Sequence, residues 1–397
     1  MKDTPLGVPR RTAALVGANG LSAAVLGQFQ FVLPWMLLSR GYSAQLAALT
    51  MVFVYGPLLL TAVPAGAACD HTDPRWMMRT SNAVALGACA AYPVAVVLGH
   101  DWFVLVLVAA VVVGTTRNFS EGALFRGIGD QTHGSSLLRA HALRTTVNQA
   151  AIFGSPFFGL LLFRLGGGGA VMLGICLLLG ACLVVLSFVP ELEREAEPIS
   201  MMRETVLGGF GTLRDSRQLR LIGLVYLTWN IFAGAAVGML PAVLREHLDM
   251  NEFTASATFV AGAVVVVVLT LPVVRLAQRR FGAILTFVVA SSVQGLAMLF
   301  FAPSGAAIVA PLVYCVFLLA NAAAAASLNG ARATAVANEY QGLLNMTLIT
   351  IGLTGFIVGL VLVAGLLAQV GFAVALLIIG VGMGVNAATF RRPLLAP

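Results

Sequence analysis

Residues Gly66–Arg79 read GAACDHTDPRWMMR and stand between two long apolar runs. Asp70 follows Gly66 by four residues at the expected end of a helix, and Arg75 and Arg79 come after it. An aspartate in this place can cap the next helix or pair with a neighbouring arginine. The stretch predicts a charged hinge loop between two membrane helices. The alternative is a loop that is charged only because it lies in water.

The composition around this stretch is that of a membrane protein. Of the 397 residues, 59% are hydrophobic and 10% are charged, and the mean hydropathy is +0.95. Soluble globular proteins carry about 25% charged residues, so the chain is expected to cross a bilayer many times. Its first apolar run, Ala13–Leu38, is too long for a signal-peptide core and is expected to remain as a membrane helix.

Several classes of function are excluded by residue content. The net charge is +7, but the arginines lie in short loops between apolar runs, so the charge indicates membrane topology and not nucleic-acid binding. The only lysine is Lys2, so the chain lacks the lysine that a Walker phosphate-binding loop needs. The five cysteines are scattered through apolar runs without metal-ligand spacing, which predicts no disulfide framework, no metal site and no cofactor.

A membrane helix needs about 20 apolar residues, and the chain contains twelve runs of suitable length. They are Ala13–Leu38, Gln45–Ala68, Thr80–Leu98, Trp102–Ala123, Ala142–Phe163, Ala170–Val189, Leu219–Leu244, Phe253–Val274, Phe281–Phe301, Ala306–Leu328, Gly342–Leu366 and Val370–Phe390.

The opening stretch resembles the signature of the major facilitator superfamily, in which a glycine, an aspartate and basic residues join the second and third helices. Gly66, Asp70, Arg75 and Arg79 fit it. The resemblance implies an all-α membrane protein with twelve transmembrane helices in two six-helix bundles. It also implies that the stretch forms part of a gate on the cytoplasmic side.

The basic residues give an orientation in the cell (inner) membrane. If both termini are cytoplasmic, only Arg40, Arg164 and Arg245 lie on the opposite side, as the positive-inside rule requires. Arg117 alone is left inside the membrane. The cytoplasmic side then holds Lys2, Arg10, Arg11, Arg75, Arg79, Arg126, Arg139, Arg144, Arg194, Arg203, Arg214, Arg217, Arg220, Arg275, Arg279, Arg280, Arg332, Arg391 and Arg392.

A hydrophilic segment divides the chain into an N-terminal bundle at 1–189 and a C-terminal bundle at 219–397. In the linker at 190–218, apolar residues recur at helical spacing from Met202 to Leu213. This pattern predicts an amphipathic helix on the cytoplasmic surface, or alternatively a solvated linker. The sequence LPxxL recurs at Leu33 and Leu240, near the ends of the first and seventh runs, which supports two related halves.

Arg117 and Glu121 are the candidates for proton coupling. A charge in a bilayer costs at least about 2.5 kcal/mol, so an arginine kept there indicates function. Glu121 follows one helical turn later on the same face and can neutralise it. The superfamily carries an arginine in its fourth helix that is linked to coupling in proton-driven members, and Arg117 matches it by location. The alternative is an ion pair at a helix end that reaches the cytoplasm.

In the fifth run, Gly154-Ser155-Pro156-Phe157-Phe158-Gly159 resembles the motif of superfamily exporters. Gly154, Pro156 and Gly159 allow a close, bendable contact with a neighbouring helix. The stretch from Leu137 to Gly159 resembles the branch that contains enterobactin and macrolide exporters. The resemblance favours export, and the alternative is a kink that serves packing alone.

Polar residues of the first, fourth, seventh and tenth helices should face a central cavity if the resemblance holds. A mostly apolar cavity with a few hydrogen-bonding groups suits a bulky amphipathic solute. Gln28 points away from this face and should meet a neighbouring helix. The alternative for each cavity residue is hydrogen bonding between helices. The candidates are Asn19, Gln30, Tyr226, Asn230, Tyr314 and Asn321.

Together these patterns predict a monomeric transporter that is not an enzyme and that exports a bulky amphipathic compound, such as a siderophore, antibiotic or drug, in exchange for protons. The partners expected are this small molecule, protons and lipid, with no nucleic acid. Two alternatives remain open: an importer of a small organic solute with the same fold, and a membrane scaffold that transports nothing. An enzyme is disfavoured because no HExxH motif, acidic pair or Ser-His pair stands on a span.

Overall fold

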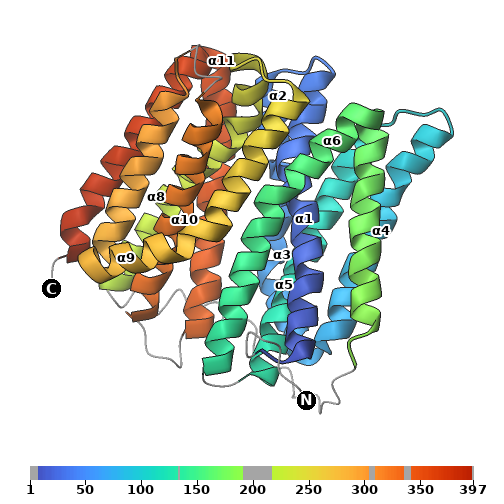
Figure 1. Ribbon diagram of the computed structural model, residues 1–397, viewed down its shortest axis with the longest axis horizontal. Helices are drawn as coiled ribbons and strands as arrows, with labels where there is room; N and C mark the ends of the chain where they lie inside the picture. The colour runs from blue at the N-terminus through green and yellow to red at the C-terminus, as the bar shows by residue number, and fades with distance from the viewer. Residues whose placement is uncertain (1–7, 133–134, 191–216, 304–308, 335–340, 396–397) are drawn as a thin grey trace. The chain divides into compact units, whose positions relative to one another are not determined.

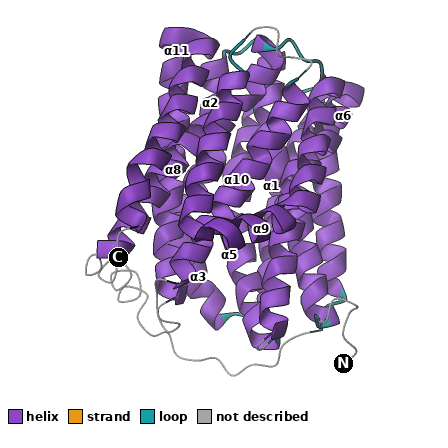
Figure 2. Ribbon diagram, turned by 60° about the vertical axis from the view of Figure 1, so that its left-hand side comes forward, coloured by secondary structure: helices purple, strands orange, loops and turns teal. Residues whose placement is uncertain are grey.

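A computed structural model describes residues 8–132, 135–190, 217–303, 309–334 and 341–395. Helices and short loops make up all of this described part, as Figure 2 shows, and it holds no strand. Helices suit a bilayer because each one satisfies its backbone hydrogen bonds internally. The helices are α1 (Arg10–Ser39), α2 (Ala44–Thr50), α3 (Val52–His71), α4 (Pro74–Val97), α5 (Val104–Gln131), α6 (Ser135–Ser187), α8 (Arg217–Ala242), the π-helical turn η1 (Val243–His247), α9 (Glu252–Phe300), α10 (Ala310–Thr334) and α11 (Gln341–Leu395).

Three of these helices are long enough for two crossings, and each is broken at glycine. The helix α6 leaves helical geometry at Gly166 and Gly167, α9 at Gly282 and α11 at Gly371. Gly167, Gly282 and Gly371 have φ values of 64°, 74° and 74°, which side chains with a Cβ atom rarely adopt. Figure 1 shows the ribbon of α6 turning back on itself, from teal to green.

The twelve predicted crossings are confirmed. The described residues contain ten helical stretches that are long and apolar enough to cross a membrane. Two of them, Leu143–Ser187 and Thr347–Phe390, have 45 and 44 residues, about twice the length of one crossing. Each holds a glycine break, so the ten stretches provide twelve crossings.

The chain divides into two compact units. Unit 1 comprises residues 1–36 and 53–200, and unit 2 comprises residues 37–52 and 201–397. The division differs from the predicted bundles in one segment, 37–52, because α2 packs against α8 and α11 of unit 2. The predicted amphipathic helix of the linker lies outside the described residues.

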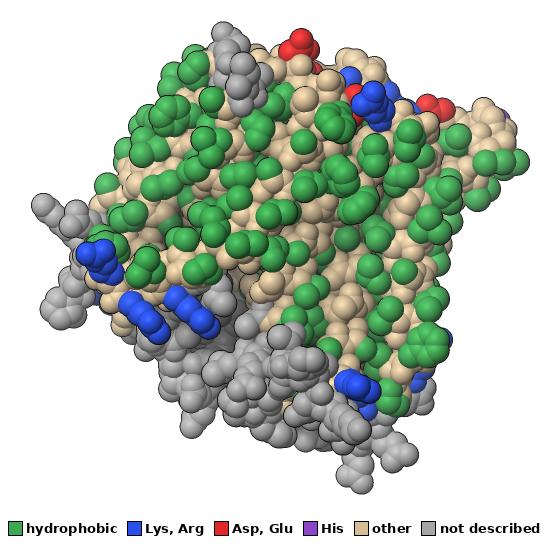
Figure 3. Space-filling view, viewed as in Figure 1, with side chains coloured by type: hydrophobic (Ala, Val, Ile, Leu, Met, Phe, Trp, Pro, Cys, Tyr) green, Lys and Arg blue, Asp and Glu red, His purple; other side chains and the backbone are tan. Residues whose placement is uncertain are grey.

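Each unit has its own buried core. In unit 1 the core joins α1, α4, α5 and α6 through Leu15, Met78, Leu124 and Leu186. In unit 2 side chains of α8, α9, α10 and α11 form the corresponding cluster. The outer sides of the helices carry exposed apolar side chains, such as Val97 at 86% exposure, and Figure 3 shows them in green along the helices, with charged side chains near helix ends. Such surfaces suit contact with lipid.

Candidate functional site

The stretch Gly66–Arg79 is more helical than predicted. The helix α3 continues through Gly66 to His71, and α4 begins at Pro74, so only Thr72 and Asp73 lie between them. The N-cap is Asp73, whose side chain accepts a 2.9 Å hydrogen bond from the Trp76 backbone N–H. The predicted hinge loop is therefore a short capped turn. The Asp70 side chain lies outside the described part of the chain.

Arg75 ties this turn to the end of α6. Its Nε donates to the Leu186 carbonyl at 3.0 Å, and its Nη2 donates to the Ser187 carbonyl at 3.2 Å. The last carbonyls of a helix have no partner within the helix and carry a partial negative charge, so a guanidinium there is stabilising. Arg79 is exposed. Of the predicted gate residues, Arg75 is the one whose contacts the structure describes.

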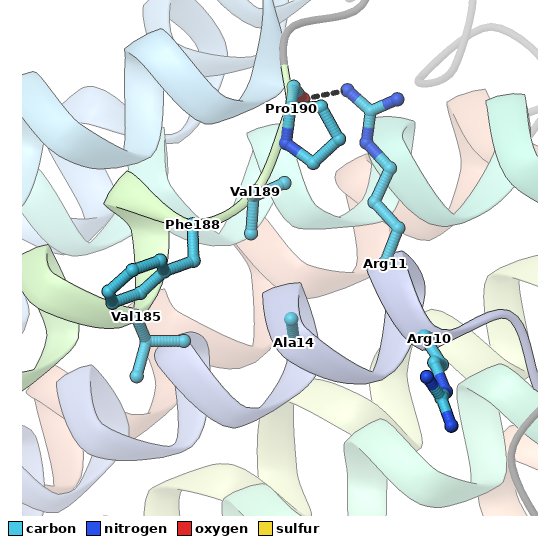
Figure 4. A pocket seen from close by; sticks show the side chains of 7 residues that line it. All are labelled: Arg10, Arg11, Ala14, Val185, Phe188, Val189 and Pro190. Carbon is cyan, nitrogen blue, oxygen red and sulfur yellow. Dashed lines mark hydrogen bonds between the residues drawn. The ribbon is translucent and has the colours of Figure 1, made fainter.

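A cavity of about 420 Å³ lies at the same end of α6. Arg11 reaches across it and donates to the Pro190 carbonyl, whereas Arg10 points to another side of α1, as Figure 4 shows. The two arginines do not converge on one point, and most of the wall is apolar. The lining residues are Arg10, Arg11, Ala14, Val185, Phe188, Val189 and Pro190.

Unit 1 also contains a buried polar cluster that joins three helices. Arg117 on α5 has a side chain only 2% exposed, and its Nη1 donates to Asn19 Oδ1 on α1 at 2.7 Å. Asn19 Nδ2 in turn donates to Asn148 Oδ1 on α6 at 2.8 Å. The predicted cavity residue Asn19 therefore bonds to both neighbouring helices.

Glu121 is held by two arginines. Its Oε2 lies 3.4 Å from Arg117 Nη2, one turn earlier on α5, and its Oε1 accepts from Arg144 Nη2 on α6. The Arg144 guanidinium also lies over the Phe125 ring, 3.8 Å from its centroid. Three side chains of α5, at 117, 121 and 125, thus point to one face, as a spacing of four residues requires.

The structure adds Arg144 to the predicted pair of Arg117 and Glu121. Counting arginines by side placed Arg144 with the cytoplasmic charges; it is the second residue of the candidate span Leu143–Ser187, and its long side chain reaches Glu121. Arg144 and Asn148 are one helical turn apart, the same spacing as that of Arg117 and Glu121. That spacing is the sequence signal that could have identified both residues.

Close packing of α1 on α6 brings Asn19 to Asn148. A Cβ atom on Gly20 would lie 2.5 Å from Val147 Cγ1, and one on Gly27 would lie 2.2 Å from the Ile152 carbonyl oxygen. Real Cβ atoms do not lie this close to other atoms, and at Gly27 the atom belongs to the backbone and cannot rotate away, so this approach requires glycine there. The position of the cluster thus depends on glycines of α1 that carry no chemistry themselves.

The exporter-like motif takes part in the same helix contact. A Cβ atom on Gly159 would lie 2.6 Å from Val32 Cγ2 and 3.3 Å from Gln28 Oε1, both on α1. Pro156 is buried within α6, and Gly154 belongs to the same helix. The motif thus makes a close contact with a neighbouring helix, and Gln28 meets that helix as expected.

The contacts of the other predicted cavity residues differ from one residue to the next. Gln30 is buried, and its Oε1 accepts from the Tyr55 hydroxyl on α3 at 2.9 Å. In unit 2, Asn230 donates to the backbone oxygen of Tyr226 at 2.8 Å. Tyr314 is fully buried, edge-on to Phe259 with 5.4 Å between ring centroids. Gln30 and Tyr314 thus contact neighbouring helices, whereas the hydrogen bond of Asn230 stays within α8.

Unit 2 has a polar chain of its own, centred on Gln294. Gln294 is fully buried in α9; its Oε1 accepts from Trp229 Nε1 at 3.3 Å, and its Nε2 donates to Asn321 Oδ1 at 3.1 Å. Sequence reasoning found Asn321 but missed Gln294, because a lone glutamine in an apolar run carries no spacing signal. Within the described residues, no three His, Cys, Asp or Glu side chains converge where a metal ion could bind.

Comparisons with known proteins agree on the family and the fold. Residues 15–345 match the family model described as Major Facilitator Superfamily. No curated protein matches the chain. A POT family transporter in complex with 5-aminolevulinic acid is similar over 99% of this chain and 98% of its own, with TM-score 0.80 and 12% identity.

Two further solved structures cover 98% of this chain and 100% of their own, each with TM-score 0.72. They are the nucleoside transporter NupG, at 12% identity, and the human organic anion transporter MFSD10, at 15% identity. At these identities the likeness establishes the fold alone.

Proposed function

The chain belongs to the Major Facilitator Superfamily of membrane transporters, and from that premise we propose that it couples proton movement to the movement of a bulky amphipathic compound. The observation that carries the proposal is the cluster of Glu121 with Arg117 and Arg144 in unit 1. A carboxylate removed from water prefers the neutral form, whereas nearby guanidinium groups favour the charged form. Movement of α6 relative to α5 changes the distance between Arg144 and Glu121, and thereby whether the neutral or the charged form of Glu121 is favoured.

The cluster offers a path from protonation to helix movement. A proton on Glu121 removes the charge that holds Arg117 and Arg144. Arg117 is also bound to Asn19, and Asn19 is bound to Asn148. Uptake of one proton therefore weakens contacts among α1, α5 and α6 together, which is what coupling in a rocking transporter requires.

Export in exchange for protons, as in the enterobactin and macrolide exporter branch, is the first candidate, supported by the resemblance of Gly154, Pro156 and Gly159 to the exporter motif. Uptake is the second candidate, and the charge of the cluster favours it. Two arginines against one glutamate give the cluster a net positive charge, which repels a cationic drug. A cationic drug carries the same charge as a proton and is therefore the simplest substrate for exchange against protons.

Transport in membrane vesicles tests both directions. Everted and right-side-out vesicles carrying the protein receive an imposed proton gradient together with a cationic probe, rhodamine 6G, or an anionic probe, carboxyfluorescein. Accumulation in everted vesicles that are acidic inside indicates export, and accumulation in right-side-out vesicles that are acidic outside indicates uptake. If Glu121→Gln keeps gradient-driven transport with its pH dependence intact, proton coupling lies elsewhere.

The stretch Gly66–Arg79 is proposed as the cytoplasmic gate. Its support is the signature formed by Gly66, Asp70, Arg75 and Arg79, together with the two hydrogen bonds of Arg75 to the end of α6. Asp70→Asn is expected to slow transport while the protein remains folded and inserted. Transport at the normal rate in Asp70→Asn would contradict the gating role.

The orientation with both termini in the cytoplasm is likewise a proposal, supported by the asymmetry of the arginines. Alkaline phosphatase is active only outside the cytoplasm, so a fusion to the C-terminus should be inactive in a bacterial host. An active fusion would reverse the assigned orientation.

A further inference from the structure

The Arg117–Glu121–Arg144 cluster carries more positive than negative charge. Two guanidinium groups face one carboxylate, so the cluster has a net charge of +1 when Glu121 is ionised. Uncompensated charge in a low-dielectric site is unfavourable. Among the described residues, Asn19 of α1 bonds to Arg117, and Cys69 of α3 and Asn82 of α4 bond to α5; these three side chains are uncharged.

The cluster also has hydrogen-bond donors to spare. The Nε atoms of Arg117 and Arg144 are buried and have no hydrogen-bond partner among the described residues. Buried polar groups are normally paired, and an unpaired donor costs about 1–3 kcal/mol. Unpaired donors and surplus positive charge at one place favour the binding of an anion.

One side of the cluster is open to such an anion. The side chain of Arg117 is 2% exposed, but those of Arg144 and Glu121 are 15% and 29% exposed. Of the two arginines, Arg144 is therefore the more accessible, and it lies beside the Phe125 ring. The planar guanidinium binds carboxylate or phosphate through two parallel hydrogen bonds, and the ring offers an apolar surface for the body of the ligand.

We propose that this cluster is the binding site for the anionic group, a carboxylate or a phosphate monoester, of the transported compound, and that the anion and a proton on Glu121 bind cooperatively. This inference rests on the proposed role of Glu121 in proton coupling. Protonation of Glu121 raises the net charge from +1 to +2 and releases donors of both arginines. The anion then binds more tightly, and by linkage its binding favours the protonated form of Glu121 to the same extent.

Cooperative binding determines how anion and proton move together. A proton and a substrate that strengthen each other's binding cross the membrane in the same direction, whereas exchange requires that they exclude one another. For an anionic compound, the cluster therefore supports symport. This conclusion strengthens the case for uptake over export.

Binding to the purified full-length protein in lipid nanodiscs tests the site independently of transport. The probes are 1-naphthaleneacetate, 1-naphthyl phosphate and the neutral 1-naphthaleneacetamide, and the readout is calorimetric affinity. We expect the anions to bind and the neutral amide to bind at least ~5-fold more weakly. We also expect the affinity for 1-naphthaleneacetate, whose carboxylate stays mostly ionised over this range, to rise at least ~5-fold from about pH 8 to about pH 5.

Variants separate this site from non-specific attraction. In Glu121→Gln, which mimics the protonated form, the anions should bind tightly at every pH. In Arg144→Gln, anion affinity should fall at least ~10-fold, corresponding to loss of one charge-assisted contact, whereas Arg164→Gln, at an exposed arginine of the same helix, should change nothing. Equal affinity for anion and amide, no anion binding, or an unchanged pH dependence in Glu121→Gln would each overturn the proposal. Proton-driven transport of a neutral compound would still leave the proposed function standing.

Discussion

Glu121 makes ion pairs with two arginines from different helices, and this decides which substitution at the cluster is most damaging. Sequence spacing identified Arg117 as its partner, because residues four apart share a helix face. The contact with Arg144 joins residues 23 positions apart, and no local pattern encodes such a pairing. Glu121 and its partner Arg117 could therefore be predicted from sequence, whereas Arg144 is brought to them only by the packing of α6 on α5.

Charge counting predicts an order of stability among three variants. Glu121→Gln leaves two buried guanidinium groups without a counter-charge, so the free energy of unfolding should fall by about 1–3 kcal/mol. Arg144→Gln leaves Arg117 and Glu121 balanced and should cost less than about 1 kcal/mol. The double variant Glu121→Gln/Arg144→Gln should regain part of the loss.

Thermal unfolding of the purified proteins in one detergent measures this order, with Arg164→Gln as the exposed control. A greater loss of stability in Arg144→Gln than in Glu121→Gln would contradict the charge count. It would show instead that Arg144 acts mainly through its contact with the Phe125 ring.

At the scale of helices, hydropathy predicted the number of crossings but not how each helix begins and ends. The run of apolar residues is read directly from sequence, since the bilayer requires it. The predicted helices end at Ala68 and begin again at Thr80, whereas α3 continues to His71 and α4 begins at Pro74, because the charged residues between them suggested a loop. For Asp70 either a cap or a pair with an arginine was expected. The cap of α4 is Asp73, immediately before Pro74, which has the fixed φ that suits a first helical position.

The contact between α1 and α6 requires glycine only at those positions of α1 that lie close to the neighbouring helix. Gly27→Ala would place a Cβ atom 2.2 Å from a backbone oxygen, whereas Gly17→Ala would meet nothing within 4 Å. Backbone cannot move aside as a flexible side chain can. Gly27→Ala should therefore destabilise the protein by about 1–3 kcal/mol, and Gly17→Ala should leave stability unchanged or slightly raised.

Separation of α1 from α6 should also disturb the polar cluster. Because Asn19 bonds to Asn148 across this contact, Gly27→Ala should weaken proton-dependent transport more than its loss of stability explains. Thermal unfolding and vesicle transport of both alanine variants measure the two effects. Equal behaviour of Gly17→Ala and Gly27→Ala would show that the contact is looser than the structure indicates.

At the scale of the whole chain, the two units do not follow the order of the sequence. A division at the hydrophilic linker was predicted, because a long polar segment separates two sets of apolar runs. The assignment of residues 37–52 to unit 2 could not be predicted, since these residues continue the same apolar pattern as their neighbours. Their place depends on packing of α2 against α8 and α11.

This division predicts that two fragments of the chain remain associated. If fragments 1–200 and 201–397 are expressed together, the first supplies α2 to unit 2, and a tag on either fragment should retain the other in mild detergent. Ala47 is fully buried in α2, whereas Leu46 is 42% exposed. Ala47→Gln would bury a polar group without a partner, at a cost of about 1–3 kcal/mol. Because this cost falls on one short helix, Ala47→Gln should release the fragments. Leu46→Gln, at an exposed position, should not release them. Retention of the fragments in both variants, measured by pull-down and size-exclusion chromatography, would show that α2 contributes little to holding the two parts of the chain together.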